Sequence, residues 1–226
     1  ELSDDLLAEL KSKLSEQFPS TIIIIGKTGV GKSSIINAIF EAKICETDPV
    51  KPCQGTNNHN KHTIYSNKTG ETYVFKTINL IDTVGLSDIS KDDTEILKNN
   101  INSANSSDLI MYVINGSTRD YSYDKEYIEE FKKTKKPIII IINKLDQLSP
   151  VREWNPPYDL NKMSNNEKNI NIREKVLWVK SEFEKFLDSS TVIIPLGIPE
   201  NETAWNLIEL REQMYNFLPE RFKLEF

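Results

Sequence analysis

The feature that most constrains the fold of this chain is the segment GKTGVGKS at residues 26–33. It follows a β-branched run at 21–25 and precedes a helical apolar pattern at 35–40, so it joins a predicted strand to a predicted helix. Glycines let the backbone curl until successive N–H groups point at phosphate oxygens, and the helix N-terminus adds its positive dipole end. This context predicts a phosphate-binding loop.

The side chains of this loop suggest how a nucleoside triphosphate is held. Lys32 is expected to neutralise the β- and γ-phosphates, and the Ser33 hydroxyl is expected to occupy one position around Mg²⁺. The predicted nucleotide-binding residues of this region are Gly26, Lys27, Thr28, Gly29, Val30, Gly31, Lys32, Ser33 and Ser34.

The base is predicted by a second motif, Asn143-Lys144-Leu145-Asp146, which follows the apolar run 137–142. The Asp146 carboxylate can accept hydrogen bonds from both N1–H and the exocyclic amine of guanine. Adenine lacks this donor pair and would leave a buried charge unpaired, which typically costs a few kcal/mol. Asn143 is expected to tie the loops together and Lys144 to stack over the base, so the motif predicts GTP and GDP as ligands.

A third motif, Asp82-Thr83-Val84-Gly85, closes the predicted strand 72–81. Asp82 is expected to hold Mg²⁺ through a water, and the Gly85 N–H is expected to bond the γ-phosphate. Both contacts need the third phosphate, so the motif predicts a segment that switches when that phosphate leaves.

Predicted strands and helices alternate along the chain. Strand patterns occur at 21–25, 62–66, 72–81, 108–114, 137–142 and 191–195, and helical patterns occur after the loop and at 91–105, 121–134, 167–188 and 203–218. Such alternation predicts an α/β fold, with a mostly parallel six-stranded sheet and helices on both faces. Residues 43–60 are predicted to be a loop, and the Pro-rich segment 147–166 an exposed excursion that Trp154 anchors.

The order GKTGVGKS, DTVG, NKLD resembles the translation-factor-related class of GTPases, and within it the Era-like family. The segment NKLDQLSPVREW and the ending from Trp205 to Pro219 resemble a prophage-associated bacterial branch. A competing kinship is the septin-like superfamily, where GKTGVGKS also occurs. The resemblance covers residues 20–219 and implies a P-loop NTPase G domain there. Leucines at helical spacing predict an N-terminal helical extension at 1–19, and residues 220–226 are expected to be a tail.

The resemblance also implies residues that the motifs do not name. The switch-I threonine that binds Mg²⁺ through its hydroxyl is expected at Thr56, chosen over Thr47 and Thr63. The loop after the last strand is expected to meet the guanine oxygen through backbone N–H groups near Gly197 and Ile198. The catalytic residues implied are therefore Lys32, Thr56 and Gly85, and the metal-binding residues are Ser33, Thr56 and Asp82.

Hydrolysis is expected to be slow. Leu86 stands where many GTPases place a Gln that orients the attacking water, and Gly29 stands where potassium-dependent relatives place an Asn. Thr28 is bulkier than the glycine that small GTPases have there. We therefore expect stimulation by an effector protein or by self-association as a homodimer. The alternative is a nucleotide-gated assembly module in which hydrolysis is incidental.

Composition limits the partners. The net charge of −6 gives no electrostatic basis for non-specific nucleic-acid binding, so nucleic acid is not expected as a partner. The cluster with Lys132 is expected to be solvated at a helix end. Two cysteines give no disulfide framework and suggest a cytoplasmic location. No apolar run reaches the roughly 20 residues of a membrane span.

Overall fold

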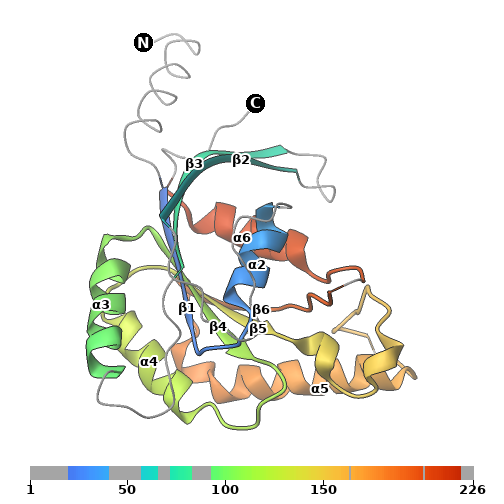
Figure 1. Ribbon diagram of the computed structural model, residues 1–226. Coiled ribbons are helices and arrows are strands. Elements are labelled where there is room, and N and C mark those ends of the chain that lie inside the picture. The colour runs from blue at the N-terminus through green and yellow to red at the C-terminus, as the bar shows by residue number, and fades with distance from the viewer. Residues whose placement is uncertain are drawn as a thin grey trace.

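The computed structural model describes residues 20–40, 57–65, 72–82, 93–162, 164–200 and 202–219, which form a sheet with helices on both faces (Figure 1). The sheet has six strands in the order β2-β3-β1-β4-β5-β6. They are β1 (Ser20–Gly26), β2 (Asn57–Tyr65), β3 (Thr72–Asp82), β4 (Leu109–Asn115), β5 (Ile138–Asn143) and β6 (Thr191–Pro195). All pairings are parallel except that of β2 with β3. The predicted mostly parallel six-stranded α/β fold is confirmed.

The helices divide between the two faces of the sheet. Helices α2 (Lys32–Phe40) and α6 (Leu207–Phe217) cover one face, and α3 (Asp93–Ser106), α4 (Ser122–Lys132) and α5 (Glu167–Glu182) cover the other (Figure 1). Two short 3₁₀ turns lie between β5 and α5, at Leu145–Gln147 and Val151–Glu153, and a third follows α5 at Glu184–Phe186. Within the described ranges, no helix combines the length and apolarity needed to cross a bilayer.

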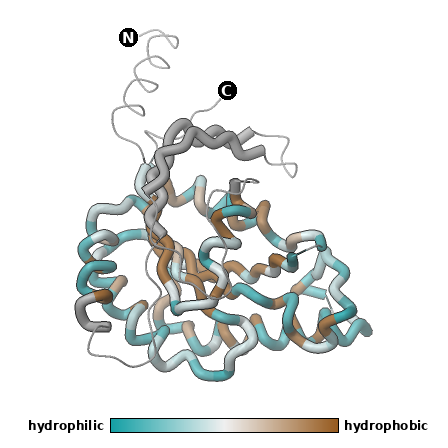
Figure 2. The backbone as a smooth tube through the Cα atoms, viewed as in Figure 1, coloured by the Kyte–Doolittle hydropathy of each residue, from teal (hydrophilic) through white to brown (hydrophobic). Residues whose placement is uncertain are grey.

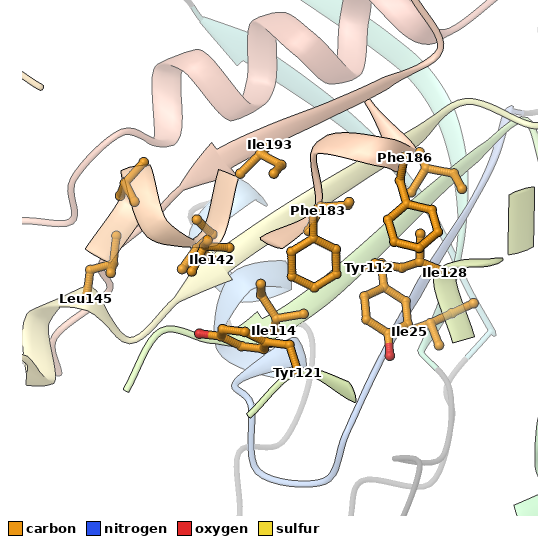
Figure 3. Close-up of a cluster of buried hydrophobic side chains, with 14 of the residues drawn as sticks. Ile25, Tyr112, Ile114, Tyr121, Ile128, Ile142, Leu145, Phe183, Phe186 and Ile193 are labelled. Atoms are coloured by element: carbon orange, nitrogen blue, oxygen red, sulfur yellow. The ribbon is translucent and has the colours of Figure 1, made fainter. Parts of the chain in front are cut away.

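The central strands are apolar on both faces. Along β1, Ile22 and Ile24 pack with α2 and α6, while Ile23 and Ile25 pack with the other helices. Such continuous apolar strands are typical of parallel sheets covered on both sides, and Figure 2 shows the hydrophobic colour concentrated along them. On the second face, aromatic rings of β4 and of the segment after α5 fill the space between sheet and helices (Figure 3).

Three predicted boundaries are wrong. The predicted loop 43–60 overlaps β2, which begins at Asn57 because its residues pair with β3, and cross-strand pairing outweighs the turn preference of asparagine. The helix predicted over 167–188 ends at Glu182 and continues as a 3₁₀ turn, and the last helix begins at Leu207 instead of 203. The expected extension at 1–19 and tail at 220–226 lie outside the described residues.

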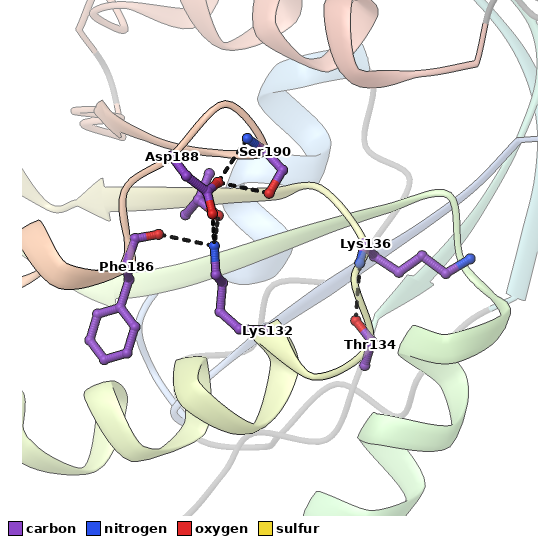
Figure 4. A network of polar contacts seen from close by, with 7 residues as sticks. Lys132, Thr134, Lys136, Phe186, Asp188 and Ser190 are labelled. Atoms are coloured by element: carbon purple, nitrogen blue, oxygen red, sulfur yellow. Dashed lines mark hydrogen bonds and ion pairs between the residues drawn. The ribbon is translucent and has the colours of Figure 1, made fainter.

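Lys132 is not the solvated lysine that the sequence predicts. Its ammonium pairs with the Asp188 carboxylate and donates to the carbonyl of Phe186 at 3.2 Å and to Thr191 Oγ1 at 3.0 Å (Figure 4). The hydrogen bond from Lys132 and those from Ser190 hold the pKa of Asp188 well below its usual range. These contacts join the end of α4 to the segment that enters β6.

Candidate functional site

The parallel strands bring the three motifs to one edge of the sheet. In the strand register, Gly26 lies opposite Val113, Asp82 lies opposite Ile24, and Asn143 ends β5. Carboxyl ends of parallel strands are where α/β proteins bind ligands. The glycine-rich loop, the start of the DTVG motif and the NKLD motif therefore meet at this edge.

The glycine-rich loop turns directly from β1 into α2, as the sequence predicts. Lys32 is buried in the first turn of α2, and its ammonium donates to the carbonyls of Gly26 at 3.1 Å and Lys27 at 3.3 Å. Its side chain thus folds back along the inside of the loop. Ser33 follows in the same helical turn, so an ammonium and a hydroxyl stand together at a helix N-terminus, where anions are favoured.

Asn143 connects the NKLD motif to the glycine-rich loop, as predicted. Its side-chain Nδ2 donates to the Val30 carbonyl at 2.8 Å, and a Cβ at Gly31 would lie well inside 3.0 Å of the same nitrogen. Only a glycine allows this approach. Asn143 is 3 % exposed, and its Oδ1 has no hydrogen-bond partner among the described residues. An acceptor buried in this way is suited to a polar ligand.

The rest of the NKLD motif forms a short 3₁₀ turn. Lys144 has φ 65°, in the left-handed region, and the Leu145 N–H donates to the Leu196 carbonyl at 3.3 Å. Leu145 is buried beneath the turn, while Asp146 is only partly buried. The turn thus anchors its apolar residue in the core and keeps its carboxylate accessible to a ligand.

The loop after β6 lies next to this turn. The Leu196 N–H donates to the Ile142 carbonyl at 2.8 Å, and the Gly197 N–H is directed at the Trp205 carbonyl at 3.5 Å. Of the two predicted guanine contacts, Gly197 therefore already has a weak backbone acceptor. No backbone acceptor for the Ile198 N–H is found within the described segments. Ile198 is therefore the better candidate donor.

The other predicted residues are placed only in part. Asp82 is the last residue of β3, beside β1 at the edge where the motifs meet. Thr56 and Gly85, and with them the predicted switch, lie outside the described residues.

Two buried charged residues near the site were not predicted. Asp124 of α4 accepts from the Tyr112 hydroxyl at 3.1 Å and pairs with Lys27 of the glycine-rich loop at 3.4 Å. Burial, and then the charge of Asp124, raise the pKa of Tyr112 well above its usual value.

Lys168 of α5 is 0 % exposed and donates to the Asp146 carbonyl at 2.6 Å. A single charge in a mixed helical pattern resembles an ordinary surface residue, so the sequence carries no signal for either.

This fold and edge geometry define a P-loop nucleotide-binding domain of the GTPase type. The family described as 50S ribosome-binding GTPase matches residues 21–144, more than half of the chain, and the chain belongs to this family. The Era-like resemblance is thereby confirmed at the level of the G domain.

Related proteins carry similar names. The chain is 32% identical over 175 residues to GTPase Der of Campylobacter lari, covering 75% of this chain and 36% of that protein. It is 29% identical over 203 residues to GTPase Era of Caldanaerobacter subterraneus, covering 88% and 55%. The chain thus spans between about a third and about half of the length of these two relatives.

Solved structures support the fold. Era of Aquifex aeolicus bound to GDP·AlF₄⁻ superposes with a TM-score of 0.60 at 21% identity, covering 88% of this chain and 57% of that one. Era in complex with MgGDPNP and a 16S ribosomal RNA segment gives 0.59 at 21% identity, covering 89% and 57%. A dimerization-deficient mutant of Toc33 from Arabidopsis thaliana gives 0.54 at 16% identity, covering 97% and 93%.

Proposed function

We propose that this domain binds guanine nucleotide with Mg²⁺ and hydrolyses GTP to GDP and phosphate. The observation that carries the proposal is the hydrogen bond from Asn143 to the Val30 carbonyl. It joins the element suited to a guanine base to the element suited to phosphates, so the two motifs form a single site.

The phosphates are assigned to the loop and the first turn of α2. Backbone N–H groups within residues 26–34 are proposed to bind the phosphate oxygens. On binding, Lys32 would move from the loop carbonyls that it contacts in this structure to the β- and γ-phosphate oxygens. Ser33 and Asp82 supply hydroxyl and carboxylate oxygens, the hard donors that Mg²⁺ prefers. The bound Mg²⁺ offsets negative charge on the phosphates. Thr56 and Gly85 are proposed to complete the site.

The base is assigned to the two loops beside β5 and β6. The Asp146 carboxylate accepts from guanine, Lys144 lies over the ring, and backbone N–H groups near Gly197 and Ile198 meet the guanine oxygen. The partial burial of Asp146 and the contact between Leu145 and Leu196 support this arrangement.

Hydrolysis is proposed to be slow without a partner. Water attacks the γ-phosphorus, the bond to the β–γ bridging oxygen breaks, and the proton of the water leaves with phosphate. The sequence offers Leu86 where a water-orienting Gln is often found. We propose that an effector protein or a second copy supplies what is missing. A cytoplasmic location belongs to the same proposal, supported by the cysteine content.

The base assignment is tested by Asp146→Asn. Xanthine carries an oxygen in place of the exocyclic amine of guanine, so an amide at 146 should favour XTP and weaken GTP by about tenfold or more. Competition titrations with GTP, XTP and ATP measure this preference. Asp159→Asn, at an exposed carboxylate of the same excursion, is the control and should leave the preference unchanged. An unaltered preference in Asp146→Asn would refute the assignment.

A further inference from the structure

The excursion between β5 and α5 packs onto the loop that follows β6. The indole ring of Trp154 covers Gly197 so closely that a Cβ there would lie well inside 3.0 Å of the ring. Its Nε1 donates to the Thr203 carbonyl at 3.0 Å, and the side chain is 9 % exposed. Trp154 is thus held at both ends against the 196–205 segment.

The same excursion is joined to the NKLD turn by a buried cation. The Lys168 ammonium donates to the carbonyls of Asp146 and Leu148, and lies 5.5 Å from the centre of the Trp154 ring. Burial lowers the pKa of Lys168, whereas the nearby Asp146 carboxylate raises it. The ammonium therefore fixes the backbone that carries the Asp146 side chain.

An aromatic cluster completes the connection between the two loops. Trp154 and Tyr158 have ring centroids 5.2 Å apart, and the rings of Tyr158 and Trp205 are nearly perpendicular with centroids 5.4 Å apart. The backbone N–H of Trp205 donates to the Gly197 carbonyl at 2.9 Å, and the side-chain amide of Asn206 donates to the Pro195 carbonyl at 3.0 Å. The loops after β5 and β6 are therefore clamped through one set of packed side chains.

We propose that Lys168 and Trp154 are positioning residues that set guanine selectivity, by holding the 144–148 turn and the 196–198 loop at a fixed separation. The inference rests on the proposed function, because these are the loops assigned to the base. Neither side chain is assigned a contact with the nucleotide. Both act through the backbone that presents Asp146 and Ile198.

Selectivity depends on this geometry because the Asp146 carboxylate must meet two donors at once. A turn that can shift keeps one hydrogen bond more easily than both, since hydrogen-bond energy falls steeply with misalignment. Inosine triphosphate (ITP) has N1–H but lacks the exocyclic amine, so the ratio of GTP to ITP affinity reports the second bond. A hydrogen bond to a charged acceptor such as Asp146 should raise the GTP:ITP affinity ratio roughly tenfold or more.

The experiment measures the dissociation constants of GTP and ITP for Trp154→Phe and Lys168→Met, with Mg²⁺ present, alongside the thermal midpoint of each variant. Both substitutions should lower the GTP:ITP ratio by about threefold to tenfold. Lys175→Met is the matched control. Lys175 is also an α5 lysine over a tryptophan, at 4.3 Å from Trp178, but it donates to Thr118, outside both loops. The GTP:ITP affinity ratio of Lys175→Met should equal that of the unaltered chain.

A purely structural role predicts a different outcome. Destabilisation alone lowers the folded fraction of the protein and weakens the apparent binding of GTP and ITP equally. An unchanged GTP:ITP affinity ratio in Trp154→Phe would therefore overturn the inference. If Lys168→Met does not fold, the conservative Trp154→Phe decides. Asp146→Ala separates the two proposals. Suppose that Asp146→Ala abolishes the preference for GTP over ITP, while Trp154→Phe and Lys168→Met retain that preference in full. The positioning role of Trp154 and Lys168 is then refuted, and the base assignment stands. If the unaltered chain shows no preference, the base assignment itself fails.

Discussion

At the scale of single residues, Gly29 and Gly31 have similar backbones and different surroundings. Their φ angles are 78° and 95°, both in the left-handed region that favours glycine. A Cβ at Gly29 would meet nothing within 4 Å, whereas one at Gly31 would collide with the Asn143 side chain. The phosphate-binding motif fixes Gly31 but leaves position 29 variable. Only the fold shows that Gly29 serves its own backbone conformation, whereas Gly31 must also leave room for the Asn143 side chain.

We expect Gly31→Ala to be more damaging than Gly29→Ala. Each alanine should cost about 1 kcal/mol of backbone strain. Gly31→Ala should also displace Asn143, break its bond to Val30, and weaken GDP binding by about tenfold or more. Urea unfolding and GDP titration measure both effects. Equal losses in the two variants would contradict the role given to Asn143.

Lys175 should make stability depend on pH. Burial, and then the charge of Arg119, lower its pKa to about 8. An unfolded lysine titrates near 10.4. Between about pH 8 and 10, Lys175 therefore carries its proton in the unfolded chain and has lost it in the folded chain. The free energy of unfolding consequently rises with pH through that window. Lys175 is only partly buried, so solvent screens part of this effect. Relative to Lys175→Met, the free energy of unfolding should rise by about 1–2 kcal/mol from pH 7 to 10, as measured by urea unfolding. A pH-independent difference would show that the lysine is solvated.

At the scale of elements, Arg211 links α6 to the end of α2. Its Nε and Nη2 donate to the Ile39 carbonyl at 3.2 and 2.8 Å, and Nη2 also donates to the Ala38 carbonyl at 3.0 Å. The last carbonyls of a helix have no partner within it, and a cation there also offsets the helix dipole. The helix that begins at the phosphate loop is therefore capped at its other end by a distant element.

Arg211→Ala should lower the free energy of unfolding by about 2–4 kcal/mol, because it removes three hydrogen bonds from the last turn of α2, two of them buried. Arg173→Ala is the comparison, since Arg173 is only partly buried and the bond from its Nε to the Leu160 carbonyl is 3.1 Å. It should cost about 1 kcal/mol. Urea unfolding followed by circular dichroism measures both. Equal costs would argue against capping as the cause.

At the scale of the whole molecule, self-association is the proposed route to faster hydrolysis. The specific GTPase rate should rise several-fold as protein concentration increases, and sedimentation should shift with GTP but not with GDP. Fast hydrolysis that is independent of protein concentration and of K⁺ would contradict the proposal.

Some features of the whole molecule follow from the sequence, and others do not. The order of strands and helices along the chain follows from patterns in the sequence, because each pattern is local. The start of β2 at Asn57 does not follow, since pairing with a distant strand outweighs local preference. The pairing of Lys132 with Asp188 was missed for a related reason, because its partner lies 56 residues away.

The sequence by itself determined the phosphate loop, the predicted base and the layered α/β fold, because glycine spacing, a short polar motif and apolar alternation each act within a few residues. Only the tertiary structure decided which side chains support that site. Lys168 beneath the NKLD turn, Trp154 on Gly197 and Asp124 beside Lys27 all join segments far apart in the chain. The identity of such partners depends on packing across the sheet edge, which no local pattern records.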